Sequence, residues 1–204
     1  MDKKEKIILA ASELFAKKGY KATTVREICS AARTNISMIS YYFGSKEKLY
    51  REIISYFTKK TSDYIYLFID KNTDIDAMSK HEKISVLLLL MDKLIEFFYK
   101  RIPSNCLKII FYEQQNMGSA PNAPVYELLR KILASLLHKD KDDKEVVFGA
   151  LNIIAPVATP RIMLSFSLKA LKRKYFDDGD LATIRKHARN NLMRVLNDYG
   201  VYDD

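Results

Sequence analysis

The sequence predicts an all-α protein with a small N-terminal helical domain, residues 1–47, and a larger helical domain, residues 48–204. Its 204 residues include only 6 Gly and 5 Pro, too few for the many tight turns of a β fold. Apolar residues make up 48% of the chain, which is enough for a sizeable core. They recur three and four positions apart in most segments, which is the spacing of one helix face.

The first helix is expected over about residues 3–18. Gly19 follows it as a residue that readily adopts the left-handed conformation at a helix C-terminus. We therefore expect one amphipathic helix whose apolar face packs against the short helices that follow. The apolar positions on this face are Ile7, Ile8, Ala11, Leu14 and Phe15.

Two short helices follow, and each begins with a capping residue. Thr24 and Glu27 have the spacing of a capping box, in which each side chain bonds to the backbone N–H of the other. Asn35 is expected to cap the next helix. Arg33 lies in the turn between them, where we expect an uncommon, left-handed backbone. Two short helices joined by a tight turn predict a helix-turn-helix, which presents its second helix to the DNA major groove.

The positive charge is concentrated in the same part of the chain. Residues 1–60 hold 13 Lys and Arg against 6 Asp and Glu, whereas the formal net charge of the whole chain is +9. A basic excess attracts phosphate and gives a salt-dependent affinity. Lysine-rich helix faces can also be simply solvated, but their coincidence with the helix-turn-helix favours DNA.

A characteristic set of residues occurs together between about residues 5 and 50. The set is Ala11, Leu14, Phe15, Gly19, Thr24, Val25, Ile28, Ala32, Tyr41–Tyr42–Phe43 and Gly44–Ser45–Lys46–Glu47–Lys48–Leu49. In combination, these residues resemble the DNA-binding domain of the TetR family of bacterial transcriptional repressors. Asn35, the Ser40–Phe43 ending and the Glu113–Asn116 run with Pro121 and Pro124 resemble the CecR-type branch of that family.

The resemblance implies that the third helix reads DNA. Tyrosine hydroxyls suit phosphate oxygens, although Tyr41 and Tyr42 could instead cover the core of the small domain. Apolar Ile36 and Met38 suit contact with a thymine methyl group. Lys46 lies at the N-terminus of the fourth helix, where backbone N–H groups also attract phosphate. The candidate DNA-binding residues are Thr24, Arg33, Thr34, Asn35, Ile36, Ser37, Met38, Tyr41, Tyr42 and Lys46.

The larger domain is predicted to be a succession of helices. One long helix runs over about 46–69, and a polar loop over 70–79 follows it. Pro156 and Pro160 are expected to kink or break a later helix, with a restart near Arg161. The other predicted elements are helices at about 81–101, 103–115, 125–138, 144–155 and from after the cap Asp180 to 199, with a turn at 118–124.

The resemblance further implies a homodimer and a small-molecule effector. The last two long helices, about 145–172 and 181–199, would pair with a second subunit as a four-helix bundle, although their apolar stripes could equally face their own core. Two paired heads would read a near-palindromic site. A pocket for an apolar or aromatic molecule is expected, while aromatic and Met residues at helical spacing are also ordinary core. The candidate lining residues are Tyr64, Met91, Phe98, Phe111, Tyr112, Met117 and Phe148.

These features predict a ligand-responsive transcriptional regulator that acts as a repressor on a double-stranded DNA operator. The alternative is a DNA-binding activator or structural DNA-binding protein without a small-molecule effector. An enzyme is disfavoured, because no G-x-S-x-G, H-E-x-x-H, glycine-rich phosphate loop or C-x-x-C occurs. We therefore expect no catalytic residue, no cofactor and no metal site.

The location of the protein is predicted from its cysteines and apolar runs. Two cysteines give no disulfide framework, and Cys29 is expected to be a small buried apolar residue. The apolar run Val86–Met91 is far shorter than the ~20 residues of a membrane span. These observations predict a cytoplasmic protein with no membrane contact.

Overall fold

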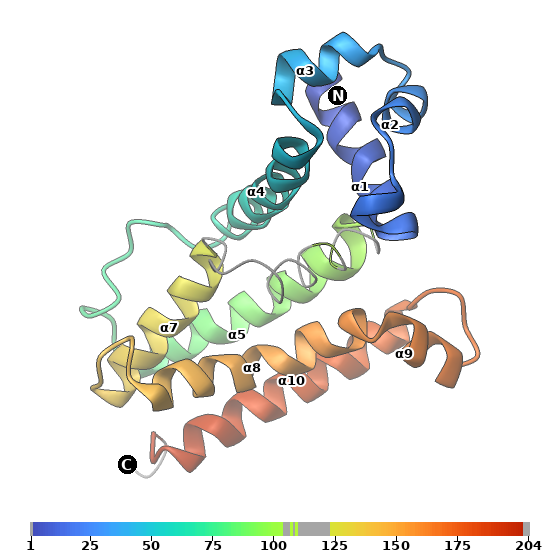
Figure 1. Cartoon of the computed structure of the whole chain (residues 1–204). Helices are drawn as coiled ribbons and strands as arrows, with labels where there is room; N and C mark the ends of the chain where they lie inside the picture. Colours follow the sequence, from blue (N-terminus) through green and yellow to red (C-terminus); the bar gives the residue numbers. More distant parts are fainter. Residues whose placement is uncertain (1, 104–106, 108, 110–122, 202–204) are drawn as a thin grey trace. The chain divides into compact units, whose positions relative to one another are not determined.

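The computed structural model describes residues 2–103, 107, 109 and 123–201, and the regular elements in them are helices (Figure 1). The predicted all-α class is confirmed. The chain forms two compact units: unit 1 holds Met1–Lys60 and Pro103–Asn122, and unit 2 holds Thr61–Ile102 and Ala123–Asp204. The division falls inside α4 (Lys46–Ile65), later than the expected domain boundary at 47/48. The helix and turn predicted over 103–122 lie largely outside the described residues.

Unit 1 begins with three helices whose ends follow local signals in the sequence. They are α1 (Lys3–Ala22), α2 (Val25–Ala32) and α3 (Ile36–Phe43). Gly19 has a φ of 80° and kinks α1, which then continues for one more turn. Ser45 caps α4 by accepting the backbone N–H of Lys48 at 3.1 Å. The predicted starts of α2, α3 and α4 are confirmed.

The core of unit 1 joins all four helices. α1 packs on α2 and α2 on α3, and Cys29 is buried there as predicted, so burial raises the pKa of its thiol. An aromatic group that we call the Phe15–Tyr20–Tyr50 trio closes one end, with ring centroids 5.0 to 5.7 Å apart. The other buried apolar residues include Ile7, Ile8, Ala11, Ile28, Ile39, Phe43, Leu49 and Ile53.

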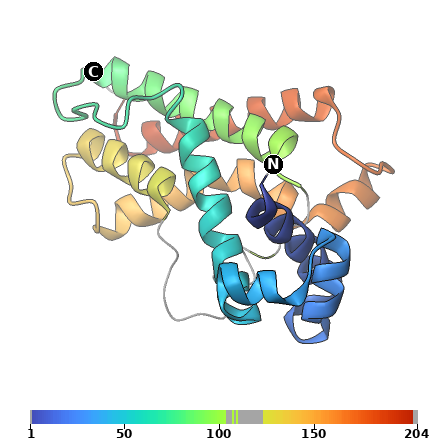
Figure 2. The same ribbon diagram turned by 90° about the horizontal axis from the view of Figure 1, so that it is seen from above.

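Unit 2 is a bundle of antiparallel and crossing helices. Its elements are the end of α4, α5 (Lys80–Glu96), the π-helix η1 (Phe97–Arg101), α7 (Pro124–Leu137), α8 (Lys144–Ile162), α9 (Leu164–Ala170) and α10 (Asp178–Asp198). Figure 2 shows α5, α8 and α10 running alongside one another, and α7 packs on both α5 and α8. α8 therefore contacts α5, α7 and α10 through one of its faces.

The predicted helix end at 155 is wrong, because α8 continues through both prolines, whereas the predicted restart near Arg161 is confirmed by the start of α9 at Leu164. A proline removes the N–H that would bond to the carbonyl four residues earlier, which for Pro156 is the carbonyl of Asn152. The side-chain amide of Asn191 on α10 donates to that carbonyl at 2.8 Å instead. A donor from a neighbouring helix thus replaces the missing one, and α8 ends only at Ile162, with α9 restarting at Leu164.

Two other predicted helix ends also differ. α4 ends at Ile65 rather than near 69, and residues 66–69 form turns in which Leu67 and Phe68 are exposed. α10 begins at Asp178, because Asp177 rather than Asp180 is its N-cap. Asp180 is the third residue of the helix and completes a capping box with Asp177.

The outer face of α8 is unusually apolar. By length and composition alone, α8 is apolar enough to cross a membrane, a property that core helices share. One face packs inside unit 2, through Val146, Ala150 and Ile153. The other face leaves Phe148 68% exposed and Leu151 48% exposed.

Candidate DNA-binding interface

The turn between α2 and α3 depends on an arginine in the left-handed conformation. Arg33 has φ 51° and ψ 53°, as the sequence predicted. Its N–H donates to the carbonyl of Ser30 at 3.2 Å, and the N–H of Thr34 donates to that of Cys29 at 2.9 Å. These bonds end α2, and they leave the Arg33 side chain exposed beside the start of α3.

The first turn of α3 is held by side chains that also face solvent. Asn35 accepts the N–H of Met38 at 3.1 Å and the hydroxyl of Ser37 at 2.6 Å. Ile36, Ser37 and Asn35 are exposed, whereas Met38 is half-buried. The first turn therefore presents one apolar and two polar side chains in a fixed arrangement, which suits contact with base edges in a groove.

The two tyrosines of α3 have different environments. Tyr41 is 79% exposed and meets Tyr42 edge-on at 5.0 Å between ring centroids. Tyr42 is half-buried and lines a hollow of about 320 Å³, together with Lys4, Lys48 and Arg51. Phe43, not Tyr41, covers the core. Glu52 also lines this hollow and pairs with Lys4, and Arg51 pairs with Glu47. Lys48 is therefore the lining cation left for a phosphate group among the described residues.

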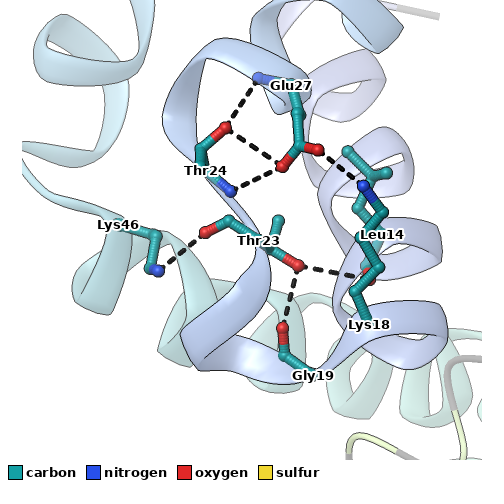
Figure 3. A network of polar contacts seen from close by, with 7 residues as sticks. All are labelled: Leu14, Lys18, Gly19, Thr23, Thr24, Glu27 and Lys46. Carbon is teal, nitrogen blue, oxygen red and sulfur yellow. Dashed lines mark hydrogen bonds and ion pairs between the residues drawn. The ribbon is translucent and has the colours of Figure 1, made fainter.

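The N-terminus of α2 is fixed by a carboxylate with a strongly lowered pKa. Glu27 accepts the N–H of Thr24 at 2.9 Å and Nζ of Lys18 at 2.5 Å, and the Thr24 hydroxyl accepts the N–H of Glu27 (Figure 3). The hydrogen bond from Lys18 and the two from Thr24 lower the pKa of Glu27 to about 2. Thr24 is exposed, but its hydroxyl is already engaged in this capping box.

The ammonium group of Lys46 is bonded to backbone carbonyls within unit 1. Its Nζ donates to the carbonyl of Tyr20 and to that of Thr23, each at 2.8 Å, and the side chain is half-buried. Figure 3 shows the bond to Thr23. The sequence placed this ammonium group correctly at the start of α4. It gave no indication that the group turns towards the end of α1.

Three exposed residues of the same surface were not among the candidates. Lys48, Arg26 and Ser40 are all exposed on α4, α2 and α3, respectively. Lys48 lies in the first turn of α4, and a Cβ added to Gly44 would be 3.8 Å from its Nζ, so it folds over the end of α3. A second lysine two positions after Lys46 was the signal that could have found it.

The candidate ligand-lining residues of unit 2 fall into three groups. Tyr64 and Met91 are buried and Phe98 is half-buried, so these three face the interior of unit 2. Phe148 lies on the exposed outer face of α8 and does not line that interior, which corrects the prediction. The remaining candidates, Phe111, Tyr112 and Met117, lie outside the described residues.

Tyr64 lies in a cluster of aromatic and cationic groups. Its ring stacks on Phe97 at 5.2 Å and meets Phe68 edge-on at 5.3 Å. The guanidinium of Arg101 lies 4.7 Å from the Tyr64 ring centroid. Burial raises the pKa of the Tyr64 hydroxyl, with a further rise from Glu96. The cluster brings aromatic faces and a cation together at the end of α4.

A basic N-terminal unit with a capped, exposed helix after a tight turn, followed by a helical body, defines a helix-turn-helix transcriptional regulator. Family models agree: the one described as bacterial regulatory proteins, tetR family, matches residues 7–53, and the C-terminal domain of the HTH-type transcriptional dual regulator CecR matches residues 87–198. The chain belongs to the TetR family of transcriptional regulators. It is therefore a DNA-binding regulator and not an enzyme.

Individual relatives and solved structures agree with this assignment. The probable regulator YttP of Bacillus subtilis is 30% identical over 68% of this chain and 59% of its own length. The chain thus spans about three fifths of that relative. CecR of Shigella flexneri is 24% identical over 78% of this chain and 75% of its own. A TetR-like regulator from Rhodococcus sp. RHA1 shares the fold, with a TM-score of 0.67 and 14% identity over 96% of both chains.

Proposed function

We propose that this chain is a ligand-responsive repressor that binds a near-palindromic operator as a dimer and is released by a small apolar or aromatic molecule. The observation that carries the proposal is the fixed first turn of α3, which presents Ile36 and Ser37 to solvent from a basic unit, with Tyr41 exposed later on the same helix. An exposed apolar side chain can contact a thymine methyl group, and exposed hydroxyl groups can bond to base edges or phosphate oxygens. A regulator of this kind acts in the cytoplasm, where the chromosome lies.

The proposed DNA contacts divide by chemistry. Ile36, Ser37 and Met38 are assigned to base edges, because they occupy the first turn of α3. Tyr41, Tyr42 and the exposed Arg33 are assigned to phosphates and groove edges. Thr24, Thr34 and Asn35 support these residues as cap and turn residues, and their exposed atoms can also approach the backbone of the duplex.

The outer face of α8 and α9 supports the proposed homodimer. The apolar stripe of α10 is buried within its own unit, so it is not free to form the whole interface. Large apolar side chains instead remain exposed on α8, on α9 and between them, and a group of exposed large apolar side chains marks a candidate protein interface. These side chains are Phe148, Leu151, Ile162, Met163 and Phe166, which together we call the α8–α9 patch.

The interior of unit 2 supports an effector site. Tyr64 with Phe97 and Arg101 offers ring faces and a cation beside the end of α4, the helix that continues into unit 1. A molecule bound there would favour one position of this helix end over another, and release requires such a difference in affinity between two states.

Repression is supported by names among the relatives. NicS of Pseudomonas putida, 38% identical over 26% of this chain, is a transcriptional repressor by name, and IcaR of Staphylococcus epidermidis is a negative regulator by name. CecR is named a dual regulator, and its C-terminal domain matches residues 87–198. A combined activating and repressing role is therefore the second candidate.

The experiment that tests the proposal begins with the full chain and random duplex DNA. Repeated selection should recover fragments that share a near-palindromic sequence, and light scattering should give the mass of a dimer. A small-molecule library is then tested for release of the recovered duplex. A monomer that prefers no duplex over an unrelated polyanion would overturn the proposal.

A further inference from the structure

We propose that Lys46 is an internal clamp that positions α4 against the α1–α2 connection, and that Lys48 supplies the phosphate contact at the start of α4. The proposal rests on the proposed DNA binding of unit 1 and assigns roles within that interface. It replaces the simpler expectation that the first lysine of α4 faces the duplex. Both lysines belong to the same compact unit as α3, the helix assigned to DNA contact, which we call the reading helix.

The acceptors of Lys46 are carbonyls that need a donor. Tyr20 and Thr23 lie at the end of α1, and the last carbonyls of a helix have no partner within it. Nζ of Lys46 donates to both at 2.8 Å. Thr23 is itself buried, with its hydroxyl bonded to the carbonyl of Gly19 at 2.8 Å. The ammonium group therefore satisfies two carbonyls at a connection that is already tightly fixed.

The ammonium group also rests on an aromatic surface. Nζ of Lys46 lies 4.3 Å from the centroid of the Tyr20 ring, a favourable position for a cation. Tyr20 belongs to the Phe15–Tyr20–Tyr50 trio, and Tyr50 lies one turn after Lys46 on α4. Two hydrogen bonds and one ring contact thus hold this side chain. Turning it outward would break all three.

Lys48 has the opposite surroundings. It is exposed, and its ammonium group makes no hydrogen bond or ion pair with any residue in the described part of the chain. It lines the same hollow as Tyr42, and neighbouring Arg51 is paired with Glu47 at 2.7 Å. An unpaired cation beside a tyrosine, at a helix N-terminus, is well placed for a phosphate oxygen.

The clamp has a consequence for the reading helix. The carbonyl of Thr23 is bound by Lys46, and the next residue, Thr24, begins the capping box of α2. α3 follows α2 through the left-handed turn at Arg33. The start of α4 is therefore linked to the start of α2 through a single residue pair, Thr23 and Thr24. Lys46 acts on DNA binding through these helices and is a positioning residue.

Salt dependence distinguishes the two roles. Binding of random-sequence double-stranded DNA is measured over a range of salt concentrations for the wild type, Lys46→Met and Lys48→Met. Each lost phosphate contact should reduce the slope of log affinity against log salt by about 0.9 per head. We expect this reduction for Lys48→Met only. Lys46→Met should lower affinity by about fivefold at every salt concentration and leave the slope unchanged, because it removes two internal hydrogen bonds.

A neutral donor at position 46 provides the matched control. Lys46→Gln keeps N–H donors that can reach a carbonyl but has no charge. It should retain more affinity and a higher Tm than Lys46→Met, with the wild-type slope. If Lys46→Met and Lys46→Gln both reduced the slope of log affinity against log salt by about 0.9, the proposal would be overturned, because that result indicates a lost phosphate contact at position 46.

Chemical labelling tests the clamp without any substitution. The wild-type chain is treated with an acetylating reagent, and the two lysines are quantified by mass spectrometry with and without duplex. Lys46 should react more slowly than Lys48 in the free protein, and duplex should protect Lys48 only. Equal reactivity, or protection of Lys46 by duplex, would contradict the clamp. A wild type that binds no duplex refutes DNA binding instead, and the labelling of the free protein still tests the clamp.

Discussion

Units 1 and 2 both expose apolar side chains, but they do so in different ways. In unit 1 the exposed groups are Ile36 and Tyr41, on a helix of 8 residues whose first turn is fixed by polar caps. In unit 2 they are the five large apolar side chains of the α8–α9 patch, with exposed Asn152 and Thr159 on the same stretch of α8. A few apolar groups on a short capped helix suit the edges of bases, whereas several large apolar side chains on two successive helices suit another protein surface.

The largest expected effect concerns the α8–α9 patch. Phe148→Glu places a charge at a side chain that is 68% exposed in one subunit, so folding should be little changed. In a dimer the charge would be buried, and we expect dissociation to become easier by about 2–4 kcal/mol. Sedimentation measures the dimer constant. Lys131→Glu, on an exposed position of α7, is the control, and equal dimer constants for both variants would refute the assigned surface.

For α3, the helix assigned to DNA contact, the expected loss is in DNA binding. Tyr41→Ala removes a side chain that is 79% exposed, so thermal stability should stay within about 0.5 kcal/mol of the wild type. Loss of a hydroxyl bond to the duplex should weaken DNA binding by about 1 kcal/mol per head. Leu67→Ala, at another highly exposed position, should leave binding unchanged. If both variants bind DNA like the wild type, Tyr41 makes no contact.

Each unit has a helix that ends at a non-glycine residue with a left-handed backbone, so one residue can be the test and the other its control. Arg33 and His138 both end a helix with positive φ, of 51° and 52°. Replacing either by Gly should stabilise the protein by about 0.5–1 kcal/mol, because Gly accepts this conformation without strain. Calorimetry measures that gain. Only Arg33→Gly should also weaken DNA binding, and a matching loss in His138→Gly would show that the turn arginine has no special role.

The smallest expected effect is a pH dependence of stability at two capping boxes, those of Glu27 on α2 and Glu82 on α5. Glu27 has a pKa of about 2 against an ordinary 4.5, so its contribution to stability is complete above pH 4.5 and is lost as the pH falls towards 2. Glu27→Gln should be less stable at neutral pH, and the difference should disappear near pH 2. Hydrogen exchange of α2 amides measures this, with Glu82→Gln on α5 as the counterpart in unit 2. A difference that persists at pH 2 would contradict the lowered pKa.

Sequence reasoning worked best where a helix end is decided by its own residues. The box of Thr24 and Glu27, the Asn35 cap and the left-handed Arg33 all form as predicted, since each needs only neighbours within four positions. Ile39 and Phe43, four positions apart, form the buried face of α3, because a helix with one apolar stripe has one way to bury it.

The errors arose where a distant residue decides the outcome. Pro156 stays within α8 because Asn191, 39 positions from Asn152, supplies a donor, and no pattern near the proline indicates this. The bonds of Lys46 to the carbonyls of Tyr20 and Thr23 also have no signal near Lys46 in the sequence, and its predicted contact with DNA stays a prediction. Phe148 was assigned to a pocket because spacing alone does not distinguish the two sides of a helix that is apolar on both.

The amide of Asn191 has a consequence for how a signal can pass through unit 2. It links α8 and α10 in one register, because sliding α10 by one helical turn would break this hydrogen bond. Axial displacement of these two helices therefore exchanges this bond for one to water, whereas a small tilt or roll about the bond preserves it. Any change of shape communicated along this pair should pivot at Asn191.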